Sequence, residues 1–331
     1  MVQWIADVLG RGFEQHTLSL PGGDEATLVR CTEPPVDIVS QFRNVDVLYI
    51  HGWSDYFFQK DLARFWASRG ARFFALDLRR YGRSLRPGQV PGFITDLADY
   101  GQEIDAALQV MASESGLGAV SRELVLLGHS TGGLTASLWA ANNPGRVSAL
   151  VLNSPWLEFQ ASGVVRSAVA PLLAAGSRIN PARPLPTIDS GIYTRAVSTA
   201  FGGEWDYNLQ WRPEQGFTLT PGFLNAVFTA QAKVARKLNI DGPVLVMLSQ
   251  KSYLHPRWSE NAKTADVALN VQAVAARAAD LGSEVCIRRF SGAFHDIFLS
   301  PKDIRAGAYS AMGRWTQNAL DPDRFALWST M

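Results

Sequence analysis

The sequence predicts an α/β protein built on a mostly parallel, doubly wound sheet. Short apolar runs recur along the chain, and their apolar residues are continuous rather than alternating, as in strands that are covered on both faces. Helical patterns separate these runs, and the repetition of strand and helix is typical of a parallel sheet. Apolar residues make up 47% of the 331 residues and charged residues 18%, which indicates a globular chain with a well-buried core.

The expected elements alternate along the chain after an antiparallel start. Residues 13–20 and 26–32 flank the turn sequence PGGDE, and they are expected to form a hairpin at one edge of the sheet. The runs expected to form buried, mainly parallel strands are 45–50, 72–76, 123–127, 147–152, 243–248 and 284–290. The segments expected to form helices between them are 57–69, 95–112, 132–142 and 267–281.

One long stretch breaks this alternation. Residues 155–240 contain many Pro and Gly residues, fragments of amphipathic helix and no convincing buried strand. Because a loop of this length is unusual inside a compact domain, we expect a helical cap inserted into a core of residues 1–154 and 241–331. The cap is rich in aromatic residues, and those expected to line an apolar substrate site are Trp156, Trp205, Trp211 and Phe228.

Composition argues against several classes of protein. The net charge is +1 without a basic block, so no nucleic-acid partner is expected. The two cysteines, Cys31 and Cys286, are too few for a disulfide framework or a cysteine-rich zinc site, and both lie in strand-like runs where a buried thiol is expected. No apolar run approaches the ~20 residues of a membrane span, and no secretory leader is recognisable. We therefore expect a soluble, cytoplasmic protein, with a homodimer left open.

The strongest chemical signal is the sequence Gly128-His129-Ser130-Thr131-Gly132. It directly follows the strand ELVLL and directly precedes the helical sequence GLTASLWAAN. In this setting G-x-S-x-G predicts a serine held on a tight strand-to-helix turn with its Oγ exposed, and the small neighbours let the two arms approach. The helix N-terminus adds backbone N–H groups near a developing oxyanion. Ser130 is the expected nucleophile.

A serine hydroxyl needs a base within hydrogen-bond reach, and His295 is the expected base. It follows the last strand in the sequence FSGAFHDIF, and the chain order nucleophile, acid, histidine is that of one large class of serine enzymes. Its neighbour Asp296 is expected to point away from the imidazole. The remaining histidines lie in the edge hairpin, in Gly-bearing turns or in a Pro-rich loop: His16, His51, His129 and His255.

The turn His51-Gly52-Trp53, at the end of the strand VDVLYI, predicts the second half of a site. A His-Gly turn there aims the backbone N–H of the next residue into the site. The N–H groups of Trp53 and Thr131 are therefore expected to bind the oxyanion of a tetrahedral intermediate, and one such donor contributes about 2.7–4 kcal/mol to lowering the barrier.

With these motifs in place, the chain resembles the α/β-hydrolase superfamily, and within it the group of monoacylglycerol lipases, lysophospholipases and serine aminopeptidase-like enzymes. The motifs that carry the resemblance are HGW at 51–53, DLRRYGRS at 77–84, GHSTG at 128–132, PVLVMLS at 243–249 and SGAFHD at 291–296. The resemblance covers roughly residues 13–155 and 240–300, and not the cap. Asp77 and Gly82 resemble a family turn that lacks its first glycine here, and we interpret that turn as structural.

The family usually places the triad acid four or five residues after the strand matching 243–249, but this chain has no carboxylate there. The segment reads SQKSYLHPRW, and the next acidic residues are Glu260 and Asp266. Asp266 directly precedes the predicted helix 267–281, so it is the expected acid, although a helix N-cap would also place an aspartate there. Glu260 is the second candidate. Two further acidic residues are expected at the opposite end of the sheet: Asp280 and Glu284.

The resemblance implies hydrolysis of a carboxylic ester through an acyl-enzyme on Ser130, His295 and Asp266, with no metal and no organic cofactor. The expected substrate is a small-molecule acyl or aryl ester such as a monoacylglycerol or lysophospholipid. An amidase or aminopeptidase would use the same triad and needs an acidic anchor for the substrate amine, which Glu204 or Asp206 could supply. Because fold does not fix function, an acyltransferase and a non-enzymatic ligand-binding protein are also compatible with the sequence.

Overall fold

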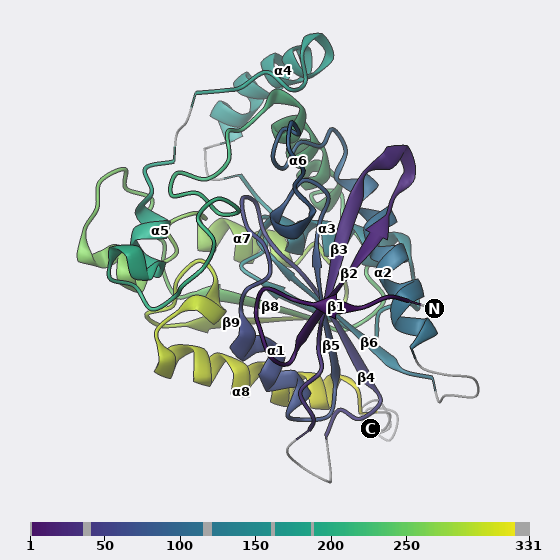
Figure 1. The fold of residues 1–331 in the computed structure, drawn as a ribbon. Helices are drawn as coiled ribbons and strands as arrows, with labels where there is room; N and C mark the ends of the chain where they lie inside the picture. Colours follow the sequence, from purple (N-terminus) through teal and green to yellow (C-terminus); the bar gives the residue numbers. More distant parts are fainter. Residues whose placement is uncertain (1, 36–40, 115–120, 160–162, 187–188, 322–331) are drawn as a thin grey trace.

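The structure is a computed structural model that describes residues 2–35, 41–114, 121–159, 163–186 and 189–321. Within these ranges, nine strands form one twisted sheet in the order β1-β2-β3-β5-β4-β6-β7-β8-β9 (Figure 1). The strands are β1 Ile5–Ala6, β2 Phe13–Ser19, β3 Glu25–Cys31, β4 Val45–Ile50, β5 Arg72–Asp77, β6 Glu123–His129, β7 Ala149–Asn153, β8 Val244–Ser249 and β9 Val285–Phe290. Strands β1, β2, β3 and β5 pair antiparallel, and all later neighbours pair parallel.

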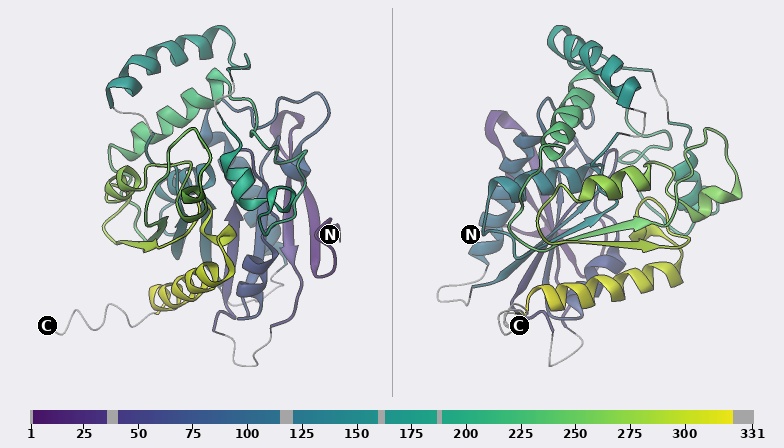
Figure 2. Two further views of the ribbon diagram at one scale, coloured as in Figure 1. Left: turned by 90° about the vertical axis from the view of Figure 1, so that its left-hand side faces the viewer. Right: turned by 180° about the vertical axis from the view of Figure 1, so that it is seen from behind.

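Helices cover both faces of this sheet (Figure 2), as its continuous apolar strands require. Val47 and Tyr49 of β4 point to the face covered by α1 and α8, whereas Leu48 and Ile50 point to the face covered by α2, α3 and α7. These helices are α1 Lys60–Ala67, α2 Gly101–Ser113, α3 Thr131–Asn142, α7 Val271–Ala278 and α8 Lys302–Ala319. The predicted α/β class with a mostly parallel, doubly wound sheet and an N-terminal antiparallel hairpin is confirmed.

The chain between β7 and β8 combines helices with long irregular stretches. The α-helices described there are α4 Gly163–Ile179, α5 Ile192–Val197 and α6 Pro221–Val234. Helix α6 contributes Phe223 and Val227 to the core on the α3 face, and α4 packs on α6 at the outer edge of the molecule (Figure 1). One short 3-10 helix, η4 Thr199–Phe201, also lies in the described part of this segment. The others described lie outside it: η1 Pro21–Gly23, η2 Gly82–Ser84, η3 Leu97–Tyr100, η5 Glu260–Thr264 and η6 Ile297–Leu299.

Some expectations about individual elements are wrong. The last helix before β9 begins at Val271 rather than at residue 267, because the Asn270 side chain accepts from the backbone N–H groups of Gln272 and Ala273 and so caps it. The last strand, β9, is an edge strand with an exposed face rather than a buried one. Cys286 on that strand is therefore exposed, not a buried thiol, and Cys31 is half-buried.

None of the helices described is long and apolar enough to cross a membrane.

Candidate active site

Ser130 occupies a strained turn between β6 and α3. Its backbone angles are φ 51° and ψ −116°, outside the regions that residues with a Cβ prefer. Glycines make this turn sterically accessible: a Cβ on Gly128 would lie 2.6 Å from the carbonyl oxygen of Gly132, and a Cβ on Gly132 would lie 2.2 Å from that of His51. The motif therefore has its glycines where two backbone segments come into contact, as the sequence predicted.

Three side chains from separate loops form a continuous hydrogen-bonded chain. The Ser130 Oγ lies 3.0 Å from His295 Nε2, and His295 Nδ1 lies 2.9 Å from Asp266 Oδ2. Since a carboxylate only accepts, Nδ1 carries the imidazole proton, and Nε2 is left to accept from the serine hydroxyl. Ser130 follows β6, Asp266 follows β8 and His295 follows β9, so all three meet at the carboxyl edge of the sheet. Their exposed fractions are 6%, 0% and 5%, so water is largely excluded. The attraction between the imidazolium that proton transfer would create and the nearby negative charges is therefore weakly screened.

Asp266 reaches this place through a longer loop than the family pattern has. Its Oδ1 accepts from the backbone N–H groups of Ala268 and Leu269, each at 2.8 Å, so both carboxylate oxygens have partners. Glu260 lies elsewhere: its side chain is 78% exposed and pairs with Lys263 at 3.1 Å. Of the two acids that sequence reasoning left open, the structure brings Asp266 to His295.

The turn at Gly52 lies directly against the serine. A Cβ on Gly52 would be 2.9 Å from the Ser130 Cβ. The backbone N–H of Leu78 donates to His51 Nε2 at 3.1 Å, so the ring proton is on Nδ1, which donates to the Gly52 carbonyl oxygen at 2.8 Å. Burial lowers the pKa of His51 and keeps this imidazole neutral.

This bond to Gly52 orients the next amide group. In a trans peptide the C=O and the following N–H point in opposite directions, so fixing the Gly52 oxygen also fixes the N–H of Trp53. Thr131 is the first residue of α3, where a backbone N–H has no intrahelical acceptor. Among the residues that the structure describes, neither of these two N–H groups makes a hydrogen bond to a protein acceptor. Both remain available to a negatively charged oxygen near Ser130.

A buried polar network that sequence reasoning missed fastens the His295 loop to the sheet. Asp296, fully buried, accepts from the Asn153 side chain at 2.6 Å and from the Gln59 side chain at 3.1 Å. The Asn153 oxygen in turn accepts from the backbone N–H of Ile297 at 3.1 Å. The Asp296 side chain thus points away from the imidazole, as expected, but it holds the loop that carries His295.

One group of buried residues has the composition of a metal site. The ligand atoms of Asp55, His129 and Asp296 lie within 4.8 Å of one another. However, Asp296 already accepts hydrogen bonds on both oxygens, and Asp55 pairs with Arg212 at 3.1 Å. A buried cation next to Asp55 disfavours a second positive charge, so these residues fit a charge and hydrogen-bond network better than a metal centre.

The four aromatic residues expected to line a substrate site divide into two groups. Trp156 lies beside the serine turn, since its backbone N–H donates to the Ser130 carbonyl oxygen at 2.9 Å, and its ring lies 6.3 Å from that of Phe159. Phe228 contacts the other side of Phe159, with ring centroids 4.8 Å apart. Trp205 and Trp211 instead belong to a separate aromatic cluster that includes Tyr56, Phe58 and Leu299. The structure therefore places Trp156 beside Ser130 and joins Phe228 to it through Phe159, whereas Trp205 and Trp211 lie in the other cluster.

The turn after β5 is held by hydrogen bonds and an ion pair of Asp77, which agrees with its interpretation as a structural turn. Asp77 accepts from the backbone N–H of Phe57 at 2.8 Å and from that of Arg83 at 3.0 Å, and it pairs with the Arg83 guanidinium. A Cβ on Gly82 would lie 2.4 Å from the Asp77 carboxylate, so glycine is needed there.

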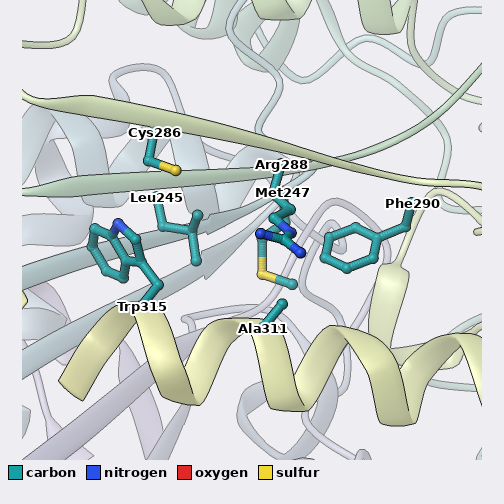
Figure 3. Close-up of a pocket in the computed structure, with 7 residues that line it drawn as sticks. All are labelled: Leu245, Met247, Cys286, Arg288, Phe290, Ala311 and Trp315. Atoms are coloured by element: carbon teal, nitrogen blue, oxygen red, sulfur yellow. The ribbon is translucent and has the colours of Figure 1, made fainter. Parts of the chain in front are cut away.

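A small hollow lies away from these residues, between the β8–β9 edge of the sheet and α8 (Figure 3). Its lining comes from the two strands and the helix: Leu245, Met247, Cys286, Arg288, Phe290, Ala311 and Trp315. None of these residues belongs to the hydrogen-bonded chain of Ser130, His295 and Asp266.

Comparison with known proteins places this geometry in a family. The family model described as "Serine aminopeptidase, S33" matches residues 44–302. The monoacylglycerol lipase of Mycolicibacterium smegmatis is 23% identical over 262 residues, covering 77% of this chain and 82% of that protein. The phospholipase YtpA of Bacillus subtilis is 32% identical over 149 residues, covering 44% of this chain and 52% of that protein.

Solved structures share the fold at low identity. The crystal structure of Paleococcus ferrophilus monoacylglycerol lipase has a TM-score of 0.63 and 18% identity, and the match covers 85% of this chain and 96% of that one. The family match includes the strands that carry Ser130, Asp266 and His295 and the turn at Trp53. The chain therefore belongs to the serine aminopeptidase S33 family of the α/β-hydrolase superfamily.

Proposed function

We propose that this protein is a serine hydrolase that cleaves carboxylic esters through an acyl-enzyme, with Ser130 as nucleophile. The observation that carries the proposal is the chain from Ser130 Oγ through His295 to Asp266, with distances of 3.0 Å and 2.9 Å, on a strained strand-to-helix turn. Serine needs this arrangement because its hydroxyl is a weak nucleophile without a base.

In the first step the Ser130 Oγ attacks the ester carbonyl carbon while His295 Nε2 takes the hydroxyl proton. Asp266 holds the imidazole in the tautomer that can accept this proton, and it stabilises the imidazolium that forms. The carbonyl oxygen becomes an oxyanion, and the N–H groups of Trp53 and Thr131 bind it more strongly than they bind the ground-state carbonyl.

In the second step the tetrahedral intermediate collapses. The bond from the carbonyl carbon to the leaving oxygen breaks, and the imidazolium of His295 gives its proton to that oxygen, which releases the alcohol. Water then repeats the sequence on the acyl-enzyme and frees Ser130. Every proton moves between His295, Ser130, the leaving group and water, so these steps require no metal and no organic cofactor.

The insertion between β7 and β8 is proposed as a cap, residues 155–240, over a site for an apolar ester. Trp156, whose backbone N–H donates to the Ser130 carbonyl oxygen, continues into a row of aromatic rings with Phe159 and Phe228, and such an apolar surface suits an acyl chain. The kinship with a monoacylglycerol lipase supports a lipid-like acyl ester as substrate.

The aminopeptidase alternative needs an acidic group that is free to bind a substrate amine. Glu204 pairs with Arg305 at 2.6 Å, and it does so on the exposed side of the aromatic cluster around Trp205. Asp206 is exposed. Neither lies among the residues that contact Ser130 or His295, so ester hydrolysis is favoured over removal of an N-terminal residue.

Labelling with a fluorophosphonate probe tests the proposal, because the probe phosphonylates an activated serine. We expect the wild-type protein to gain one probe mass, and we expect Ser130→Ala to gain none while its thermal unfolding is unchanged. Initial rates with p-nitrophenyl esters from acetyl to palmitoyl would then define the acyl preference, with an aminoacyl p-nitroanilide as the amide comparison. A Ser130→Ala variant that hydrolyses these esters at the wild-type rate would overturn the assignment.

A further inference from the structure

The loop that carries the Trp53 N–H is bound by side-chain and backbone groups of the insertion between β7 and β8. Residues 53–56 connect the Gly52 turn to α1, and among the residues that the structure describes their backbone makes no hydrogen bond with another backbone group. The loop is fixed at its two ends, by His51 at Gly52 and by Asp77 at Phe57. Between these two ends the rings of Trp53 and Tyr56 pack on Tyr81, Arg83 and Phe223. The polar links come from residues 205–217 of the insertion, which we call the clasp segment.

Three consecutive loop residues each bind the clasp segment through a polar link. The Ser54 Oγ accepts from the backbone N–H of Phe217 at 2.9 Å. The Asp55 carboxylate pairs with the Arg212 guanidinium at 3.1 Å. The Tyr56 hydroxyl oxygen accepts from the backbone N–H of residue 208 at 2.8 Å. All three loop side chains are buried, so water competes little for these links, least for those to Arg212 and Phe217.

Aromatic contacts reinforce the same pairing of segments. The rings of Trp53 and Phe217 meet edge to face at 6.1 Å, and so do those of Tyr56 and Trp211 at 5.1 Å. The rings of Phe58 and Tyr207 lie 4.9 Å apart. Edge-to-face and offset pairs have preferred geometries, so these contacts fix orientation as well as burying area.

Arg212 is the central residue of the clasp segment. It is 5% exposed, and besides Asp55 it faces the rings of Tyr207 at 4.6 Å and Tyr193 at 4.9 Å. Buried ion pairs add little net stability compared with apolar residues of similar size, whereas removal of one partner leaves an uncompensated buried charge. Removal of Arg212 would therefore leave the buried Asp55 carboxylate without its cation.

Ser54 adds a further sign of constraint next to the oxyanion donor. Its φ is 50°, a left-handed conformation that residues with a Cβ adopt rarely, and it immediately follows Trp53. Such a conformation persists only where surrounding contacts impose it, and the contact at Ser54 is the bond from Phe217.

We propose that the clasp segment positions the oxyanion donor of Trp53, with Arg212 as its main anchor. The inference rests on the proposed ester hydrolysis. An oxyanion hole works because its donors are already in place before charge develops, so a loop that shifts by a fraction of an ångström loses transition-state binding without losing substrate binding. The insertion thus contributes to the rate of the chemical step and not only to substrate recognition.

The test compares Arg212→Met, which removes the charge at similar length, with Arg195→Met. Arg195 is an exposed arginine of the same insertion that lies over Trp258 at 4.3 Å and does not touch the loop. With p-nitrophenyl acetate, whose acyl group is too small to need the cap, we expect Arg212→Met to lower kcat about 10- to 100-fold, somewhat less than removal of a whole donor. KM should change less than about threefold, and Arg195→Met should match the wild type. Arg212→Lys should recover part of the loss.

The affinity for a transition-state analogue distinguishes a misplaced oxyanion donor from a general loss of folded structure. A trifluoromethyl ketone inhibitor forms a tetrahedral oxyanion on the serine, so its affinity should fall by about the same factor as kcat. Ser54→Gly removes the acceptor of the Phe217 N–H, which costs stability, but it also relieves the positive φ, which offsets part of that cost. It should therefore lower kcat with only a small fall in the unfolding temperature. This variant keeps the proposal falsifiable if Arg212→Met fails to fold.

Two outcomes overturn the proposal while leaving the proposed function intact. One is a Ser54→Gly or folded Arg212→Met protein with wild-type kcat and inhibitor affinity. The other is a loss confined to KM, which would mean that the clasp segment acts on substrate binding alone. Failure of the proposed function is recognised separately, because the wild-type protein would then show neither probe labelling nor ester hydrolysis.

Discussion

Replacing Asp266 by asparagine changes one atom of the hydrogen-bonded chain, and the surrounding loop dictates where that atom goes. Two backbone N–H groups, from Ala268 and Leu269, donate to Oδ1 at 2.8 Å each. An amide NH₂ cannot accept these bonds, so the asparagine oxygen must take the Oδ1 position. The NH₂ group is then forced toward His295 Nδ1, which in the wild type donates to the carboxylate at 2.9 Å.

This forced orientation selects the unproductive imidazole tautomer. An NH₂ group facing Nδ1 needs a lone pair there, so the ring proton moves to Nε2, and Nε2 can no longer take the proton of Ser130. In a serine protease the equivalent change lowers kcat about 10⁴-fold, and the same loss is expected here. It corresponds to about 5.4 kcal/mol of lost transition-state stabilisation.

The assay is the initial rate of p-nitrophenyl ester hydrolysis, together with the rate of fluorophosphonate labelling. Thermal and urea unfolding serve as controls, and Asp266→Asn should keep nearly wild-type stability because the asparagine oxygen keeps both of its donors. Asp266→Ala should lose stability instead, since two buried N–H groups lose their acceptor at about 1–3 kcal/mol each. Glu260→Gln is the matched control for charge removal, as the Glu260 side chain is 78% exposed.

A folded Asp266→Asn protein with kcat within about tenfold of the wild-type value would refute the reasoning, because the wrong tautomer should lower kcat by the full factor of about 10⁴. If Glu260→Gln lost activity instead, the two acids would exchange roles. If neither change mattered, the chemistry would run without an acid on the imidazole.

Two further predictions concern the turns beside the serine. Gly52→Ala adds a Cβ 2.9 Å from that of Ser130 and should push the oxyanion turn away, lowering kcat about 10²- to 10³-fold in steady-state assays and costing about 1–3 kcal/mol of stability; wild-type kcat would contradict the placement of the turn. Burial lowers the pKa of His51 and His129 below 6.5, so the unfolded chain binds these protons first and acidification favours unfolding. The free energy of unfolding measured with urea should fall between about pH 7.5 and 5.5, and part of this fall should vanish in His129→Asn.

The sequence alone determined those features that depend on short spacings. Gly128, Ser130 and Gly132 lie within five residues, and a strand before them and a helix after them define the turn, so their geometry follows from local backbone sterics. His295 was identified from its place after the last strand, because parallel strands bring their carboxyl ends to one edge. The alternation of apolar runs with helical patterns likewise predicts the parallel sheet, and the turn sequence PGGDE predicts its antiparallel start.

The exposure of a single strand depends on the strands and helices that pack beside it, which the sequence does not give. The apolar run of β9 was expected to be buried, but a strand at a sheet edge has a neighbour on one side only, and Cys286 is exposed as a result. A short apolar run has the same appearance in a central strand and in an edge strand, so only the observed strand order distinguishes the two.

Only the tertiary structure decided which distant groups meet. Asp266 and Glu260 were both open candidates, and the choice depends on the path of the loop after β8, which brings one carboxylate to His295 and leaves the other in solvent. Asp55 and Arg212 are far apart in the chain, and no spacing in the sequence relates them. Local patterns reflect the backbone preferences of a few residues, whereas these pairings are set by how an irregular insertion packs on the sheet, so contacts of this kind are determined by the whole fold.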